Sequence, residues 1–179
     1  MTKKKAIIVI LLLLVFSAFE ISAETGSTGK AKQLIGPNAS GKLQLIIGAG
    51  ASPKYLQEWV STPPSTPARV DRIKEVGPKQ TTYIGFFVTG YSLDKNKNVN
   101  CAVDVTIYDP KGQILFSLPK YAKINGSNKE NGFLALDPAL DFTLETSDPA
   151  GTYRIEGIIT DIISGKTAKA AYDLKLNKK

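Results

Sequence analysis

The chain of 179 residues contains no histidine. This absence excludes serine or cysteine triads that use an imidazole base, and zinc sites built on imidazole nitrogens. No serine lies in a G-x-S-x-G elbow, and a serine nucleophile without histidine would need a lysine to activate it. We therefore predict that the protein is not an enzyme, with no catalytic residues, no cofactor and no metal site.

Cysteine is nearly absent as well, since Cys101 is the only one. A single cysteine cannot form a disulfide within the chain, so it is either a buried thiol or paired with another chain. Cys101 begins a run in which the apolar residues Val103, Val105 and Ile107 follow at every second position. That alternation favours a buried, unreactive thiol, and pairing with another chain is the alternative.

Positive charge exceeds negative charge, with a formal net charge of +7, but no dense basic cluster occurs. The lysines and arginines are spread through turns and alternate strand positions and are not interleaved with aromatic residues. A nucleic-acid-binding surface needs such a patch on one face, so we predict no nucleic-acid partner. Mild basicity suits solubility, or a weak attraction to anionic polymers of a cell envelope.

The longest apolar stretch lies at the N-terminus. Residues 1–5 are basic, residues 6–19 are uncharged and apolar, and residues 21–23 resemble a small-residue cleavage site. This order is typical of a secretory signal peptide, and the apolar run is too short to span a bilayer comfortably. We predict a signal peptide over residues 1–23 and a periplasmic or secreted bacterial protein; an uncleaved membrane anchor is the alternative.

The remaining chain divides by composition. Residues 24–41 are small and polar, which predicts a flexible tether. Residues 42–67 are predicted to be an N-terminal extension, with a short strand at 43–48 and an extended proline-rich segment at 61–67. Residues 68–179 are predicted to form the main domain.

The main domain carries a pattern of short strands separated by turns. Turn signals recur about every 8–12 residues, and no long helical pattern occurs. Strands are expected at residues 70–76, 81–91, 100–108, 113–118, 133–136, 142–146, 152–159 and 167–176, with a polar loop over 120–132. This pattern predicts an all-β fold, an antiparallel sandwich of two sheets.

One local motif adds a resemblance to a known family. Residues 148–153 (DPAGTY) resemble the corner of immunoglobulin-like domains, in which a tyrosine opens the penultimate strand. The resemblance implies that Tyr153 is a structural residue whose hydroxyl bonds back to the corner backbone. Ile155 stands where antibody domains have a disulfide cysteine, and the strand expected from Asn100 has no core tryptophan. The chain is therefore similar to disulfide-free immunoglobulin-like or fibronectin-type modules of exported bacterial proteins.

Three motifs that suggest chemistry are better explained by turns. Residues 36–42 match G-x-x-x-x-G-K, but Leu43 replaces the Ser or Thr that binds Mg²⁺, and a strand pattern follows. Asp94 begins a D-x-N-x-N series, but valines occupy the positions where a calcium loop needs glycine and glutamate. Paired carboxylates could serve a hydrolase, yet the candidates occupy ordinary turn positions: Asp137, Asp141, Glu145 and Asp148.

Aromatic residues remain as candidate binding groups. The core explains most strand aromatics, whereas Tyr55, Trp59 and Tyr91 are candidate binding residues; residues 55–60 allow one or two helical turns. We predict a non-enzymatic binding or structural module that acts on an envelope protein or polymer. The alternative is a carbohydrate-binding module in which these three aromatics are exposed in a row, and a third hypothesis is a hydrolase.

Overall fold

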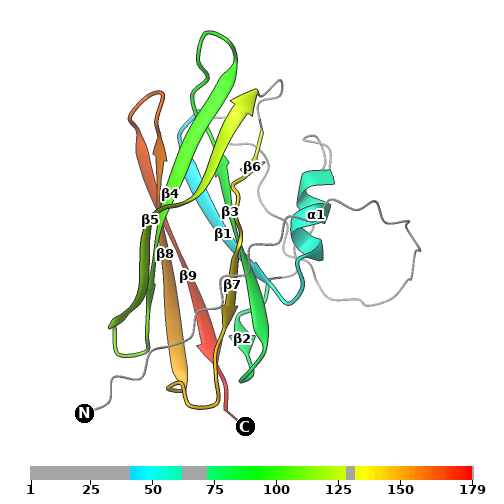
Figure 1. The fold of residues 1–179 in the computed structure, drawn as a ribbon, viewed down its shortest axis with the longest axis vertical. Helices are drawn as coiled ribbons and strands as arrows, with labels where there is room; N and C mark the ends of the chain where they lie inside the picture. Colours follow the sequence, from blue (N-terminus) through cyan, green and yellow to red (C-terminus); the bar gives the residue numbers. More distant parts are fainter. Residues whose placement is uncertain (1–40, 62–71, 128–131, 179) are drawn as a thin grey trace.

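The computed structural model describes residues 41–61, 72–127 and 132–178, without the side chains of residues 59–61. The predicted signal peptide and residues 24–40 of the predicted tether lie outside this part of the chain. In the described ranges, nine strands and one helix build two sheets packed face to face (Figure 1). The elements are β1 (Gln44–Gly50), α1 (Lys54–Ser61), β2 (Glu75–Val76), β3 (Thr81–Thr89), β4 (Asn98–Tyr108), β5 (Ile114–Ser127), β6 (Leu134–Ala135), β7 (Leu140–Thr143), β8 (Gly151–Asp161) and β9 (Thr167–Leu176).

One sheet is built around β3. This strand of nine residues is rich in β-branched and aromatic side chains, which favour strands. Strand β1 pairs with it antiparallel, in a register that sets Gln44 opposite Thr89 and Gly50 opposite Tyr83. The short strands β6 and β7 also pair antiparallel with β3, one near each end.

The other sheet has the strand order β2-β9-β8-β4-β5. Strand β2 is parallel to β9, and the other neighbours are antiparallel. In β8, Tyr153, Ile155 and Ile159 are buried, whereas Arg154 and Glu156 lie on the outer face. This alternation gives the sheet one apolar face that packs on the β3 sheet.

The core lies between the two sheets. Cys101, Val103, Val105 and Ile107 of β4 all turn into it, so the predicted buried thiol is confirmed. Burial, with Asp161 nearby, raises the pKa of Cys101 to about 12. The thiol therefore stays protonated near neutral pH and is a packing group.

The corner before β8 has the geometry that the immunoglobulin-like resemblance implies. The buried Tyr153 donates its hydroxyl hydrogen bond to the carbonyl oxygen of Pro149, at 2.8 Å. Its ring meets Phe142 of the opposite sheet edge-on, with 6.0 Å between ring centroids. Burial, with Asp148 and Asp109 nearby, raises the pKa of Tyr153 to about 12. The fold is an all-β, immunoglobulin-like antiparallel sandwich.

The predicted start of the sandwich at residue 68 is wrong. Strand β1 falls in the expected N-terminal extension, yet it pairs along its whole length with β3. Its side chains Leu45, Ile47 and Ala49 are buried in the core. The proline-rich segment, residues 61–67, suggested a domain boundary, but such a segment can also lie between two elements of one domain. Residues 62–71 lie outside the described part of the chain.

Helix α1 covers the side of the β3 sheet that faces away from the core (Figure 1). Its Tyr55 packs against Phe87, and Leu56 joins this small second cluster. The expected helical turns at 55–60 are confirmed as a helix of eight residues. In the described ranges, no helix is both long enough and apolar enough to cross a membrane.

Strand β5 is longer than predicted. It continues to Ser127, through most of the loop expected at 120–132. A bulge opposite Asp104 accommodates the irregular stretch, because Lys120 adopts a φ of 51° and its N–H donates to Asp104 Oδ1 at 2.7 Å. At the other edge, β2 forms only the last two residues of the strand expected at 70–76, of which 70 and 71 are not described.

Candidate functional site

Tyr55 does not belong to an exposed aromatic row. Only 7% of its surface is exposed, and its hydroxyl shares its hydrogen between the carbonyl oxygens of Gly48 (3.2 Å) and Tyr83 (3.0 Å). Burial, only partly offset by a backbone hydrogen bond from Gly85, raises the pKa of Tyr55 above its usual range. Tyr55 thus fixes α1 to the sheet, and it does not have the exposure expected of a surface binding residue.

The other two predicted aromatics have different positions. Trp59 lies in α1, but its side chain is outside the described part of the chain. Tyr91 is half-buried against the core, and its hydroxyl accepts a long hydrogen bond, 3.5 Å, from the N–H of Gly132. Because Tyr55 is buried, the expected row of three exposed aromatics is not formed.

The carboxylates singled out in the sequence serve turns and strands. Asp148 Oδ2 accepts the N–H of Glu145 at 2.7 Å, which closes the corner before β8. Asp141 sits in β7, and Asp137 makes an isolated bridge to Lys123. In the described ranges, no group of three or more cysteine, aspartate or glutamate residues could hold a metal ion.

The D-x-N-x-N series forms the polar turn that the sequence favours. Asp94 Oδ1 accepts the N–H groups of Asn96 (2.7 Å) and Asn98 (2.8 Å), and Oδ2 accepts the side-chain amide of Asn98 at 3.0 Å. These hydrogen bonds, with those from Asn98 the largest cause, lower the pKa of Asp94. The G-x-x-x-x-G-K match cannot be placed, since residues 36–40 lie outside the described part of the chain.

The first candidate surface is the outer edge of β5, which we call the β5 edge and define as residues 114–118. β5 is the last strand of its sheet, and in this stretch its pairs are with β4. Three large apolar side chains are exposed here: Ile114 (63%), Leu115 (39%) and Leu118 (41%). Further along, Lys123 bridges to Asp137, so only the first half of β5 lies open among the described residues.

The other sheet edges are protected in ways that the β5 edge is not. Strand β2 has two residues and carries charge, since Glu75 lies 3.8 Å from Lys175. Strand β1 is uncharged, but its large side chains are buried or half-buried, and the carbonyl of Ala49 accepts the N–H of Ile73. Short strands, charges and cover are the usual means of preventing edge-to-edge pairing. Among the described residues, the β5 edge has none of these three before Pro119; its one irregularity is a register shift at Leu115, between the pairs Tyr108–Ile114 and Ile107–Phe116.

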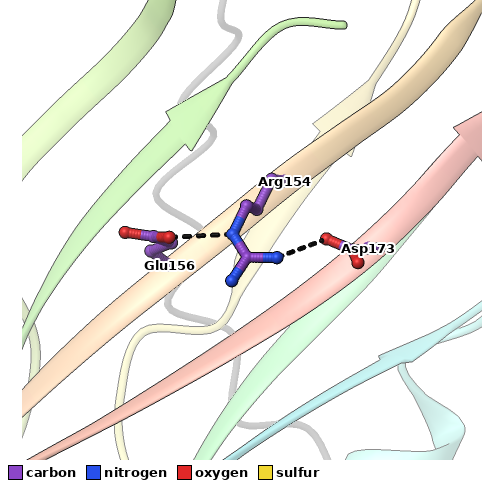
Figure 2. A network of polar contacts seen from close by, with 3 residues as sticks. All are labelled: Arg154, Glu156 and Asp173. Carbon is purple, nitrogen blue, oxygen red and sulfur yellow. Dashed lines mark hydrogen bonds and ion pairs between the residues drawn. The ribbon is translucent and has the colours of Figure 1, made fainter. Parts of the chain in front are cut away.

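The second candidate surface is a shallow depression on the outer face of the same sheet, which we call the Arg154 hollow. Its volume is about 420 Å³. Arg154 lies between two carboxylates, with Nε 2.8 Å from Glu156 Oε1 and Nη1 3.2 Å from Asp173 Oδ1 (Figure 2). These contacts, the Glu156 bond first, raise the pKa of Arg154. The hollow is lined by Tyr108, Asp109, Gly112, Thr152, Arg154, Glu156 and Asp173.

The two surfaces adjoin each other. Tyr108 of β4 is the cross-strand partner of Arg154 on one side and of Ile114 on the other. Sequence reasoning missed both surfaces, because neither is encoded locally. A strand was expected at residues 113–118, but nothing in that stretch showed that the strand lies at an edge. The one feature of the sequence that could have pointed to the β5 edge was the lack of charged residues between Lys111 and Lys120.

Comparisons with known proteins give structural neighbours only. No protein-family model and no curated protein matches the chain. A CARDB domain from Pyrococcus furiosus, solved with two metal ions, is 13% identical with a TM-score of 0.41, and the match covers 75% of this chain and 92% of that one. A family 123 glycoside hydrolase from Clostridium perfringens is 8% identical with a TM-score of 0.39. That match covers 75% of this chain but only 28% of the hydrolase. At these scores neither likeness bears on function.

Proposed function

We propose that this chain is a non-enzymatic binding module of the exported bacterial kind, and that it holds a protein of the cell envelope. The observation that carries the proposal is the β5 edge, where Ile114, Leu115 and Leu118 are exposed beside backbone that no described strand pairs with. An open strand can accept an extended segment of another protein, which adds a strand to the sheet. The main-chain hydrogen bonds provide affinity, and the apolar side chains provide a surface to bury.

The export part of the proposal depends on the sequence. Residues 1–23 have the basic start, the apolar middle and the small residues at the end of a signal peptide. A thiol that is buried and unpaired suits an oxidising compartment, since it offers nothing to oxidise or exchange. A fibronectin-type module that connects or docks envelope proteins is therefore the role we assign to it.

The test compares two variants that place a lysine at equally exposed apolar positions. Leu115 lies on the β5 edge and is 39% exposed; Ile163 lies in the turn between β8 and β9 and is 38% exposed. The chain without residues 1–23 is used to capture proteins from an envelope extract. We expect the wild type and Ile163→Lys to capture the same protein and Leu115→Lys to lose it, because a charge on an edge opposes strand addition. Equal capture by all three would contradict the proposal.

A carbohydrate-binding module is the second candidate, and the Arg154 hollow is the observation that favours it. A half-buried tyrosine, Tyr108, lies beside Arg154, which is flanked by Glu156 and Asp173. Aromatic faces stack on sugar rings, and planar charged groups bond sugar hydroxyls. This site replaces the row of Tyr55, Trp59 and Tyr91 that the sequence suggested.

Retention on an insoluble envelope polysaccharide tests the second candidate. We expect Tyr108→Ala to weaken retention about tenfold, because a lost aromatic contact is worth about 1 kcal/mol or slightly more. Ile163→Lys is again the control, and it should be retained like the wild type. Passage of the wild-type protein through the polysaccharide unretained would rule this candidate out.

A further inference from the structure

The charges around the β5 edge follow a pattern. Residues 112–119 contain no charged side chain. Lys111 precedes this stretch, and Lys120 and Lys123 follow it. All three lysines are exposed, and none forms an ion pair with a described residue. The β5 edge is thus an apolar, uncharged centre with positive charge at both ends.

Two carboxylates, those of Asp109 and Asp104, lie close to these lysines in sequence or across the strand, but they accept hydrogen bonds from backbone N–H groups. Asp109 Oδ1 accepts the N–H groups of Lys111 and Gln113, each at 2.8 Å. Asp104 Oδ1 accepts the N–H of Lys120 at 2.7 Å. Both carboxylates serve the turn and the bulge that bound the edge. They reduce the local positive charge without tying down the ammonium groups, which remain in solvent.

The dimensions of the edge set the size of its partner. At about 3.4 Å per residue, residues 114–118 span at most about 17 Å of strand, because the bulge at Leu115 shortens the stretch. Pro119 has no N–H, so the ladder of hydrogen bonds to an added strand ends there. An added strand therefore needs about five residues in its centre, and the residues beyond each end come close to the lysines.

A second copy of this chain fits the edge poorly. Antiparallel pairing of β5 with β5, centred on Phe116, sets residue 112 opposite residue 120 and residue 111 opposite residue 121. Lys111 of one copy and Lys120 of the other then lie one position apart at both ends of the ladder, so positive charges gather there. Like charges this close repel each other, most strongly at low salt. The charge pattern disfavours self-association and favours a segment with negative ends.

We infer that the strand received by the β5 edge is a short apolar segment, of alternating side chains, with acidic residues on both sides. This inference rests on the proposed function and names the chemistry of its partner. The apolar centre of the bound segment covers Ile114, Leu115 and Leu118 of the β5 edge. One acidic end of the segment pairs with Lys111, and the other pairs with Lys120 and Lys123. Charge complementarity of this kind sets specificity and association rate more than it adds affinity.

Two labelled peptides test the inference, DEVTITVDE and its basic counterpart KKVTITVKK. Binding to residues 24–179, a chain that contains every described residue, is followed by fluorescence anisotropy at low and at high salt. We expect the acidic peptide to bind at least about tenfold more tightly at low salt, with the difference shrinking as salt screens the charges. Leu115→Lys should abolish binding of both peptides.

A charge reversal on the protein gives the sharper comparison. Lys111→Glu with Lys120→Glu should reverse the preference, so that the basic peptide becomes the tighter ligand. Lys54→Glu with Lys166→Glu changes the net charge equally at exposed positions in α1 and in the β8–β9 turn. This control pair should keep the preference for the acidic peptide, within about a factor of two, since neither substituted lysine lies on the β5 edge or is one of the three lysines that flank it.

The outcomes separate the inference from the proposed function. If capture from the extract depends on Leu115 but the peptides bind equally, or neither binds, the inference is overturned and the proposed function stands. If capture does not depend on Leu115, the proposed function itself fails. A dimer of the wild type in sedimentation, lost in Leu115→Lys, would overturn the inference by showing that a second copy is the occupant.

Discussion

Asp161 connects parts of the chain that are far apart in sequence. Its buried carboxylate accepts hydrogen bonds from Ser92 N (2.9 Å), Ser164 Oγ (2.6 Å) and Ile163 N (3.1 Å). Burial is the largest single influence and opposes ionisation, but the hydrogen bonds from Ser164 and Ser92 together outweigh it. The pKa of Asp161 is therefore lowered. The carboxylate holds the β8–β9 turn against the loop that follows β3.

A carboxylate with a lowered pKa makes stability depend on pH in a defined direction. Its contribution is present above the unfolded-state pKa of about 3.9 and is lost as the pH falls through the lower, folded-state pKa. We expect Asp161→Asn to reduce the free energy of unfolding by about 2 kcal/mol at about pH 7, because the new amide N–H₂ group faces backbone and hydroxyl donors. The difference from wild type should shrink towards about pH 3.

Urea unfolding across that pH range measures the effect. Asp141→Asn, an exposed residue of β7, is the control and should stay within about 0.5 kcal/mol of wild type. A difference for Asp161→Asn that does not change with pH would contradict the role given to the carboxylate.

The structural role of Tyr153 could be predicted from the sequence, because its hydrogen-bond partner is four residues away. The role of Asp161 could not, because its partner Ser92 is 69 residues away.

At the scale of the element, hydrophobic alternation was sufficient to predict the position of a strand where that strand is regular. Strands β4, β8 and β9 lie close to their expected ranges, with the expected faces buried. The second half of β5 was missed because Pro119 and the glycine and asparagine near its end are read as strand breakers. A bulge supported by Asp104 carries the strand past them. Exposure of the β5 edge was missed because only the strand order decides which strand lies outermost.

The turn after β3 shows how closely two elements can approach. Gly90 has a φ of +69°, and a Cβ on it would lie 2.0 Å from the carbonyl oxygen of Lys42, just before β1. Gly112, in the β4–β5 turn, has a φ of +77°, but no atom of the described residues lies within 4 Å of the corresponding position. A side chain at either position would cause backbone strain, because both glycines have a positive φ. Only at Gly90 would it also clash with neighbouring backbone.

Alanine at these two positions separates strain from contact. We expect Gly112→Ala to cost about 1 kcal/mol, the strain of a left-handed residue. Gly90→Ala should cost about 3 kcal/mol or more, because the backbone of Lys42 and Leu43 must also move and β1 with it. Thermal and urea unfolding give both values. Equal losses would mean that β1 is less firmly seated against β3 than the distances indicate.

At the scale of the whole molecule, sequence reasoning found the sandwich but placed its start too late. The pattern of short strands and the corner at Tyr153 are local signals, and they predict the fold class without knowledge of pairing. The pairing of β1 with β3 joins residues about forty positions apart, across the helix α1 and the proline-rich segment. Only the folded chain shows that the apolar face of β1 completes one wall of the core.

Truncation at the expected boundary tests the role of β1 directly. Removing residues 1–67 deletes Leu43, Leu45 and Ile47, and each buried side chain of this size contributes about 1.5–3 kcal/mol. It also uncovers one whole edge of β3. Since a domain is stable by only about 5–15 kcal/mol, we expect residues 68–179 to give no cooperative unfolding and poorly dispersed amide signals. Residues 41–179 should unfold cooperatively, because every described strand is retained. A folded 68–179 fragment would show that the second sheet and β3 hold together without β1, and that the boundary suggested by composition is real.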